Sequence, residues 1–446
     1  MYNVLHVTHS WGGGIITYIN DMQKSSKDLL NIFILKCSQG WIFLEYHANK
    51  LKVSKKYFFG KEIKLTDYKS FEYAQILSTI LDEFNIDIVH IDSSVGHPFD
   101  IFYVPFIKNI PIVLSVHDFF YICPTFHLID TNGIYCGICE EGEEKDSCLK
   151  NHGYLYSKFS ADNLIEWRKK FRSIISNIDA FVFPSESAKR IFSNFYNIES
   201  SCCKLISHGT SLKKCERSLS LDSSRKFRVG ILGSMLKHKG KFLVKSVIRF
   251  LENYPIEFYH FGDGNLTAQN LVNFGQYRQD NILNLLQSNH IDIMLLLSTW
   301  PETFSYTLTE TIAANIPPIV TNLGALKERV SRDNIGWVVD YKDPYKISEL
   351  ILRLSIEKTE VQYFKDKIEN SKLKSLSEMI DEYLSLYNDL ISEKKMKDTN
   401  HLVEYWKILP TKRYTMNIFF RILYPFILEA ESLIFKLNKK IRFNRK

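Results

Sequence analysis

The sequence has no excess of one charge over most of its length. Its 446 residues carry 57 Lys or Arg and 50 Asp or Glu. Ten of the basic residues and three of the acidic ones lie within 401–446, which leaves 47 of each sign in residues 1–400. A DNA-binding body carries a basic footprint, and this balance argues against one. We therefore expect no nucleic acid among the partners of this protein.

The sequence also lacks long apolar runs. No uncharged apolar run reaches the roughly 18 residues of a membrane span. The first residues show no basic region followed by an apolar core, so we expect no secretory signal. The eight cysteines do not suggest a disulfide framework in so long a chain without an export signal. These observations predict a cytoplasmic protein.

What the sequence does contain is a repeated alternation of short apolar runs with longer amphipathic stretches, which is typical of α/β architecture with parallel sheets. The length of 446 residues suits about two or three domains. We predict two Rossmann-like, doubly wound domains that face a central cleft, where ligands bind outside the carboxyl ends of the strands. The predicted parts are an N-terminal domain at 1–212 with a Cys-rich insertion at 123–151, a polar linker at 213–226, a C-terminal domain at 227–374, an amphipathic helix at 375–398 and a basic amphipathic tail at 399–446.

Two acidic residues follow the apolar run at Ile291–Leu297, on either side of the start of a helix predicted from Tyr306. The first N–H groups of a helix lack intrahelical partners and carry positive charge, which favours a phosphate or diphosphate. Glu302 precedes this helix and Glu310 lies inside it. Eight helical residues span roughly 12 Å, too far for the carboxylate pair of a glycosidase at about 5–9.5 Å. The pair suits hydroxyl groups at opposite ends of a nucleotide-sugar.

Glycine-rich turns follow two other predicted strands. After Arg228–Leu232, Lys239 supplies a mobile positive charge for a departing diphosphate. This segment is not a Walker A loop, because the pattern G-x4-G-K-[ST] is absent. Gly12–Gly14 follow the first strand, but Thr17 occupies the last position of the pattern G-x-G-x-x-G. A dinucleotide oxidoreductase is therefore disfavoured.

The segment from Glu302 to Glu310 resembles the E-x7-E motif of retaining family 4 glycosyltransferases, and the resemblance extends from about residue 1 to about residue 395. These enzymes have the GT-B fold and move a sugar from a nucleotide-sugar to an acceptor. The resemblance implies that the N-terminal domain at 1–212 binds the acceptor and that the C-terminal domain at 227–374 binds the donor nucleotide. The resemblance implies that Glu302 contacts the donor sugar and that Glu310 contacts the ribose. It also implies that the backbone at Phe304 and Ser305 faces the diphosphate.

The turn with Lys239 is similar to the family's G-R-x4-K-G motif, whose Arg and Lys neutralise the donor phosphates. Lys239 matches the Lys of that motif. Ser234 stands where the motif has Arg, and Lys237 or Arg278 is a candidate substitute. This departure keeps open a non-catalytic sugar-nucleotide-binding or scaffold protein of the same fold.

Further positions match the family in the N-terminal part. His117 matches a His that contacts the transferred sugar, and Gly13 and Gly14 match a loop near the donor phosphate. Gly209 and Gly262 match turns near the cleft. The helix at 375–398 resembles the family's helix that crosses back to the first domain.

The resemblance thus implies a retaining hexosyltransferase with His117, Glu302 and Lys239 as its catalytic residues and no cofactor needed for catalysis. Its acceptor is expected to be a saccharide or a lipid-linked molecule, in a pathway for bacterial cell-envelope polysaccharide such as lipopolysaccharide. A nucleotide-sugar epimerase of the GT-B fold remains a further alternative.

Four cysteines of the insertion form a possible metal site. A tetrahedral structural Zn²⁺ takes thiolate ligands, and one C-x2-C step is present among Cys123, Cys136, Cys139 and Cys148. Reduced or redox-labile thiols are the alternative interpretation.

The tail combines apolar faces at helical spacing with a strongly basic end. Residues 416–446 can therefore lie on an anionic membrane. We predict peripheral attachment to the inner face of the plasma membrane, with docking on the body or on a partner as the alternative.

Overall fold

The computed structural model describes residues 1–26, 28–48, 51–130, 132–137, 160–215, 224–264 and 266–393. Cys139, Cys148 and the predicted tail at 399–446 lie outside these residues. The predictions that concern them therefore remain predictions.

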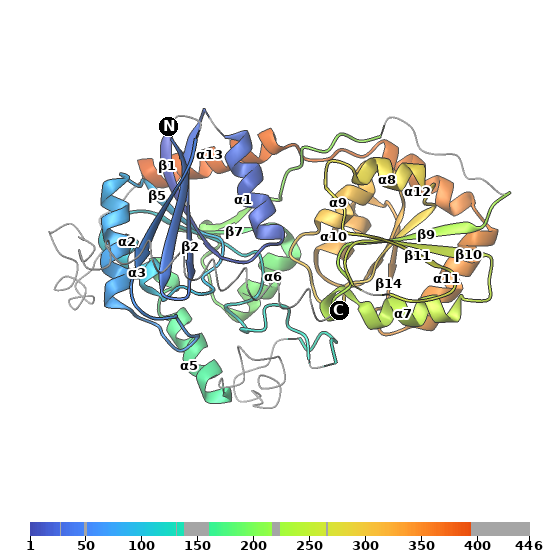
Figure 1. Cartoon of the computed structure of the whole chain (residues 1–446), viewed down its shortest axis with the longest axis horizontal. Coiled ribbons are helices and arrows are strands. Elements are labelled where there is room, and N and C mark those ends of the chain that lie inside the picture. Colours follow the sequence, from blue (N-terminus) through green and yellow to red (C-terminus); the bar gives the residue numbers. More distant parts are fainter. Residues whose placement is uncertain are drawn as a thin grey trace, which may run out of the picture.

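The N-terminal half, which begins at the blue end of the chain in Figure 1, forms a sheet of eight strands in the described residues. Their order is β4-β3-β2-β1-β5-β6-β7-β8. Six neighbouring strands are parallel, namely β2, β1, β5, β6, β7 and β8. Strands β3 and β4 add an antiparallel edge next to β2. The strands are β1 (Tyr2–His9), β2 (Leu30–Ser38), β3 (Trp41–Ala48), β4 (Leu51–Phe58), β5 (Ile88–Ile91), β6 (Ile112–Ser115), β7 (Ala180–Phe183) and β8 (Cys203–Leu205). Helices connect the parallel strands, and they are α1 (Gly14–Ser25), α2 (Phe71–Glu83), α3 (Asp100–Ile107), α5 (Ala161–Arg172) and α6 (Glu186–Phe195).

The C-terminal half forms a six-stranded parallel sheet within the described part of the chain, in the order β11-β10-β9-β12-β13-β14. Its strands are β9 (Phe227–Leu232), β10 (Ile256–Phe261), β11 (Leu271–Gly275), β12 (Ile293–Leu296), β13 (Pro318–Thr321) and β14 (Trp337–Val339). Its helices are α7 (Lys241–Phe250), α8 (Ile282–Ser288), α9 (Tyr306–Ala313), α10 (Gly324–Asp333), α11 (Pro344–Ile356) and α12 (Thr359–Glu369).

These two sheets confirm the predicted two-domain α/β architecture, but some elements differ from the prediction. The hairpin of β3 and β4 was not predicted, because β4 has four polar residues among its eight and no buried one, and so lacks an apolar run. Helix α3 was not predicted either. Its residues are buried on all sides and include Pro105, so no amphipathic pattern marks it. The helices of the described residues include none with both the length and the apolar character to cross a membrane.

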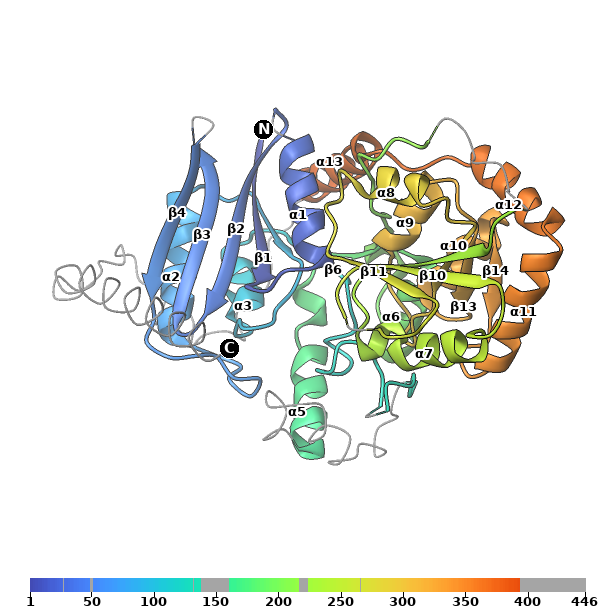
Figure 2. The same ribbon diagram turned by 45° about the vertical axis from the view of Figure 1, so that its right-hand side comes forward.

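Helix α13 (Leu376–Ser392) follows the C-terminal domain in sequence but packs against the N-terminal domain (Figure 2). A capping box between Ser375 and Glu378 starts the helix. Its buried residues Met379, Tyr383 and Tyr387 join a core cluster with residues of β1, β2 and α1. The predicted range of 375–398 extends past this helix into residues that are not described.

The chain crosses between the domains at two places that touch each other. The Thr210 N–H donates to the Lys374 carbonyl at 2.9 Å, and Thr210 also forms a backbone bridge with Ser375. The Lys214 ammonium donates to the carbonyls of Glu369 and Ser371 at 3.1 and 2.8 Å. The first residues of the predicted linker are therefore fixed to the end of α12.

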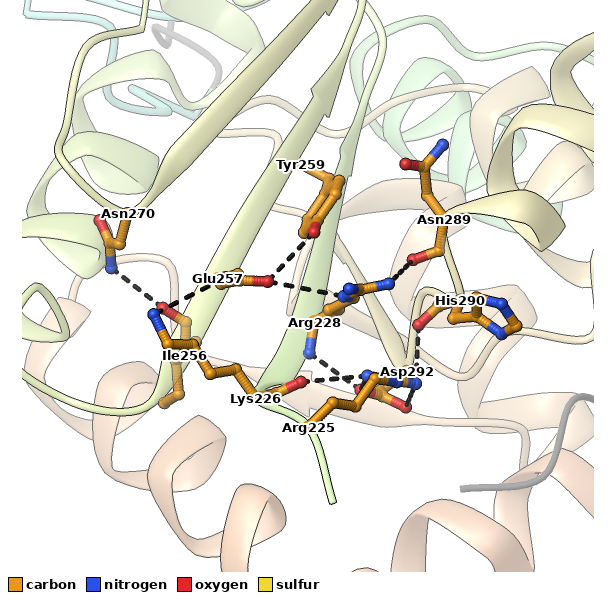
Figure 3. A network of polar contacts seen from close by, with 10 residues as sticks. All are labelled: Arg225, Lys226, Arg228, Ile256, Glu257, Tyr259, Asn270, Asn289, His290 and Asp292. Carbon is orange, nitrogen blue, oxygen red and sulfur yellow. Dashed lines mark hydrogen bonds and ion pairs between the residues drawn. The ribbon is translucent and has the colours of Figure 1, made fainter. Parts of the chain in front are cut away.

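A polar network fixes the chain where it enters the C-terminal sheet (Figure 3). Arg225 donates to both carboxylate oxygens of Asp292, at 2.8 and 2.9 Å, and the Arg228 N–H donates to the same carboxylate at 2.8 Å. Bidentate pairs of this kind are strong and directional. The network lies at the amino ends of β9 and β12, so it supports the sheet from the end opposite to the loops described next.

Candidate active site

Two loops of the C-terminal domain meet because their strands are neighbours. Strands β9 and β12 pair in parallel, so the segments after their carboxyl ends lie side by side. Gly240 has a left-handed backbone with φ of 77°, and a Cβ there would collide with the Leu297 carbonyl. The Thr299 N–H donates to the His238 carbonyl at 3.0 Å. This close approach requires glycine at position 240.

The contact between these loops joins Lys239 to Glu302. The Lys239 ammonium lies 2.9 Å from Glu302 Oε1, and the Ser298 hydroxyl donates to the same oxygen. The Glu302 side chain is 6% exposed, whereas that of Lys239 is 31% exposed. An ammonium has three donors, so Lys239 can bind a second anionic group while it holds Glu302.

The start of α9 follows this loop and is held by an arginine that the sequence did not indicate. Ser305 caps the helix by accepting from the Leu308 N–H at 3.3 Å. The buried guanidinium of Arg329, on α10, lies over the Phe304 ring at 4.5 Å and donates to the Ser305 carbonyl at 2.9 Å. Burial lowers the pKa of Arg329 to about 10, so this group stays charged at neutral pH. It adds positive charge behind a helix end that already favours anions.

Glu310 lies within α9 and faces the turn after β11. The Tyr277 hydroxyl donates to its carboxylate at 2.8 Å. Burial raises the pKa of Glu310 to about 7, although the bond from Tyr277 opposes this shift. The ionisation of Glu310 is therefore sensitive to small changes near neutral pH.

On the N-terminal side, His117 and Asp92 follow the adjacent parallel strands β6 and β5. His117 Nε2 lies 3.3 Å from Asp92 Oδ1, and the His117 side chain is 5% exposed. Because a carboxylate only accepts, this contact places a proton on Nε2 of His117. Asp92 was not predicted as a site residue, although its position directly after a buried strand was the available signal.

Asp92 is the centre of a buried histidine cluster. Its Oδ2 lies 2.8 Å from Nδ1 of His6. Burial alone would raise the pKa of Asp92, but His6, His90 and His117 outweigh it and lower this pKa well below its usual value. His6, His90 and Asp92 have the spacing of a metal-binding group. Both His90 nitrogens already have hydroxyl partners, on Tyr387 at 2.6 Å and on Ser115 at 2.7 Å. We therefore interpret the cluster as a hydrogen-bonded support.

The two sides of the site are in direct contact. The Thr303 hydroxyl, next to Glu302, donates to the His117 carbonyl at 2.6 Å. The ring of His208 lies 4.5 Å from that of Phe304. The structure thus brings His117, Glu302 and Lys239 into one region between the domains.

A second group of contacts links the loops after β9 and β12 to the segment after His117. The rings of His127 and His238 stack at 3.9 Å, and the Thr299 hydroxyl donates to the Gly133 carbonyl at 2.6 Å. Part of the predicted insertion therefore borders the site.

The predicted glycines occupy several places. Gly13 is exposed, has a φ of 109° and precedes α1. Gly14 starts α1, and a Cβ there would lie 3.6 Å from the Tyr306 ring across the cleft. A Cβ on Gly262 would collide with the Gly233 carbonyl, and one on Gly209 with the Ser375 carbonyl. Gly209 thus belongs to the crossing between the domains.

The remaining predicted residues lie nearer the surface. Ser234 is exposed in the turn after β9. Arg278, a suggested substitute for the missing Arg, is 84% exposed and pairs with Asp280 at 2.7 Å. Cys123 Sγ lies 3.2 Å from the Thr125 hydroxyl, and Cys136 is exposed. Two of the four cysteines are not described, so the zinc site stays a prediction.

The geometry of the site agrees with comparisons to known protein families. Residues 226–371 match the family model described as Glycosyl transferases group 1. Residues 47–214 match the one described as Glycosyltransferase Family 4. The two matches cover most of both domains and mark the chain as a glycosyltransferase of the group 1 and family 4 type.

Similar proteins come from bacteria. An uncharacterized 41.2 kDa protein in the cps region of Klebsiella pneumoniae is 20% identical over 404 residues, which cover 86% of this chain and 99% of that protein. The crystal structure of Anabaena HepE in complex with UDP and glucose is similar with a TM-score of 0.60, 14% identity, and coverage of 87% of this chain and 100% of that one. Sucrose-phosphate synthase from Thermosynechococcus elongatus gives a TM-score of 0.60 and 12% identity over 88% and 100% of the two chains. The predicted GT-B fold is thereby confirmed.

Proposed function

We propose that this protein transfers a sugar from a nucleotide-sugar to a saccharide or lipid-linked acceptor, with retention of the anomeric configuration. The observation that carries the proposal is the pair of Lys239 and Glu302, which lies at the carboxyl ends of the C-terminal strands and is linked through Thr303 to His117. A cation and a buried carboxylate of one domain thus lie beside the backbone of the other domain at His117. We place the reaction in cell-envelope polysaccharide biosynthesis.

The donor assignment is supported by the charges of the C-terminal side and by the neighbours. In the Anabaena HepE structures the ligands are UDP, glucose and UDP-glucose. The start of α9 and Lys239 suit the diphosphate of such a molecule. Glu310 suits the ribose hydroxyls, because an ionised carboxylate accepts two hydrogen bonds.

Bond cleavage leaves negative charge on the departing diphosphate. Lys239 and the first N–H groups of α9 are in place before the reaction, so they stabilise this charge without reorganisation. Glu302 holds Lys239 and is buried, so we assign it a contact with the donor sugar as well. We expect these protein groups to supply the charge neutralisation for catalysis.

His117 is assigned the orientation of the transferred sugar. Since its Nε2 proton is directed to Asp92, the Nδ1 atom remains an acceptor for a sugar hydroxyl. Asp92 is then a positioning residue that fixes the ring and its tautomer. The buried bonds of Asp92 to His6 also limit movement of the carboxylate.

The decisive experiment measures turnover of UDP-, GDP- and other nucleotide-sugars by the full chain with saccharide and lipid-linked acceptors. We expect one donor to be consumed only with acceptor, and NMR of the product to show retention. Glu302→Gln should abolish transfer, whereas Glu349→Gln on the exposed face of α11 should not.

Three outcomes would contradict the proposal. Conversion of the nucleotide-sugar without acceptor would indicate an epimerase. Nucleotide binding without turnover would indicate a scaffold protein. Full activity of Glu302→Gln would show that the Glu302 carboxylate is not needed for catalysis.

A further inference from the structure

A separate cavity of about 400 Å³ lies inside the N-terminal domain. It opens at the carboxyl ends of β1, β2 and β5, and the loop with Glu62 and Asp67 forms one wall. Ser94 and Phe120 line it and closely follow Asp92 and His117 in the chain, so the cavity adjoins the candidate active site. Its volume lies within the range of small-molecule sites.

Aromatic rings form much of the cavity wall. Trp11 is 46% exposed, and its ring meets Phe126 edge-on at 6.0 Å. Phe126 stacks on Phe120 at 5.1 Å, and Phe120 meets Trp167 at 4.9 Å. The exposed ring of Trp11 therefore stands at the end of a rigid aromatic row.

Two polar groups in this wall, the Ser94 hydroxyl and the Trp167 indole N–H, lack a hydrogen-bond partner among the described residues. The indole N–H of Trp167 is buried and has no hydrogen-bond acceptor among the described residues. Buried donors are normally paired, so this one is suited to a ligand oxygen. A sugar ring satisfies both features, because its C–H face packs on aromatic rings and its hydroxyl oxygens accept hydrogen bonds.

The charges around the cavity do not favour an anion. Burial lowers the pKa of His97 to about 4, and it also lowers the pKa of His9. Both imidazoles are therefore neutral at neutral pH. The formally charged groups that remain in the lining are Glu62, Asp67 and Lys64, and Asp67 also pairs with Lys61 at 3.5 Å. The positive charges are thus matched by carboxylates, and no excess of positive charge is present to attract a phosphate, in contrast to the surroundings of Lys239.

We propose that this cavity binds a neutral sugar ring of the acceptor, stacked on Trp11, and that any phosphate-bearing part of the acceptor lies outside it. This inference rests on the proposed glycosyl transfer and adds the chemical class of the acceptor group. The sugar in this cavity is uncharged, and Trp11 determines its affinity.

The test uses saturation-transfer NMR on the full chain. The probes are the methyl glycosides of glucose, galactose, mannose and N-acetylglucosamine, each compared with the corresponding sugar 1-phosphate. We expect transfer to one or more neutral glycosides and none to the phosphates. Trp11→Ala should weaken glycoside binding by about tenfold or more, and Trp11→Phe should retain part of it.

A matched control is Phe242→Ala, which removes an aromatic ring that is 54% exposed on the other domain and should leave binding unchanged. The inference fails if no neutral glycoside binds, if the 1-phosphates bind equally well, or if Trp11→Ala behaves as Phe242→Ala does. Thermal melting of each variant verifies folding.

UDP binding, measured on the same samples, separates this inference from the proposed function. Glycoside binding that depends on Trp11 supports the cavity assignment even if UDP does not bind, and in that case the transferase proposal is the one that fails. UDP binding and donor turnover without any glycoside binding overturn the cavity assignment alone.

Discussion

The loops after the strands carry charge in the C-terminal domain and rings in the N-terminal domain. After β9 and β12, Lys239 and Glu302 form an ion pair next to the start of α9. After β1 and β6, the chain presents Trp11 and His117, with the buried carboxylate of Asp92 behind. One side suits a diphosphate, and the other suits a neutral sugar.

This difference shows that the sheets themselves determine little of the ligand preference of each domain. Both domains are wound in the same way and offer the carboxyl ends of parallel strands to the cleft. The ligand that each side suits depends on a few side chains in short loops. Fold similarity therefore predicts where ligands bind, and the loop residues predict which ones.

The largest effect is expected when a positive charge is removed from the C-terminal side. We expect Lys239→Ala to lower kcat by roughly 10²–10³-fold, the cost of losing one group that stabilises transition-state charge. Lys245→Ala, on the exposed face of α7, is the control and should leave kcat unchanged. Steady-state kinetics with the preferred nucleotide-sugar measure both. A loss below tenfold for Lys239→Ala would argue against its role.

The corresponding change on the N-terminal side is Asp92→Asn. An amide still accepts a bond from His117 but no longer carries the charge that fixes this ring and His6. We expect kcat to fall by about 10²-fold or less, with a shifted pH profile and an almost unchanged Kd for UDP. Kinetics across pH and calorimetry measure these quantities. Equal losses in kcat, UDP affinity and thermal stability would instead show a purely structural role.

Substitution of a glycine by alanine should also affect stability differently in the turns of the two domains. A Cβ at Gly240 meets the Leu297 carbonyl, and its φ of 77° strains any other residue. We expect Gly240→Ala to lower the free energy of unfolding by about 2–3 kcal/mol or more. A Cβ added at Gly12 would meet no atom within 4 Å, so Gly12→Ala should leave stability unchanged. Denaturant unfolding of both variants measures the difference.

The smallest expected effect concerns Glu310. Burial raises its pKa to about 7, above its unfolded value of about 4.3. The folded state therefore binds this proton more tightly, so the contribution of Glu310 to stability is full below the unfolded pKa and is lost as pH rises through about 7. Glu310→Gln should reduce the fall in melting temperature between pH 5 and pH 8.

The affinity for nucleotide should rise with pH, whereas the contribution of Glu310 to stability falls. The ionised carboxylate is the better acceptor for ribose hydroxyls. We expect UDP to bind several-fold more tightly at pH 8 than at pH 6. Calorimetry should show this dependence in Glu349→Gln, which is the control, and a flat profile in Glu310→Gln. If UDP binding by Glu310→Gln still depends on pH, a group other than Glu310 causes the dependence.

The sequence predicted the fold and the residues that follow strands, because both depend on local patterns. Apolar runs marked most of the parallel strands, and the strand–loop–helix order singled out Glu302 and Glu310. Strand β4 could not be found in this way, since half of its side chains are polar and none is buried.

Other residues of the site become visible only when distant segments are placed together. Arg329 acts on Phe304 and Ser305 from a helix that the sequence did not predict. The role of Asp92 depends on His6 and His117, which come from two other strands and loops. The cavity at Trp11 is formed by segments that are far apart in the chain.

The paired crossings of the chain have a consequence for motion between the domains. Because the segment at Thr210 is bonded to Lys374 and bridged to Ser375, the two crossing segments form one paired connection between the domains. Rotation about an axis through the contact, like the opening of a book, would preserve it. Such a rotation separates Thr303 from His117 but leaves each sheet and its loops intact. Lys239 and Glu302 both belong to the C-terminal domain, so such a rotation would leave their ion pair intact.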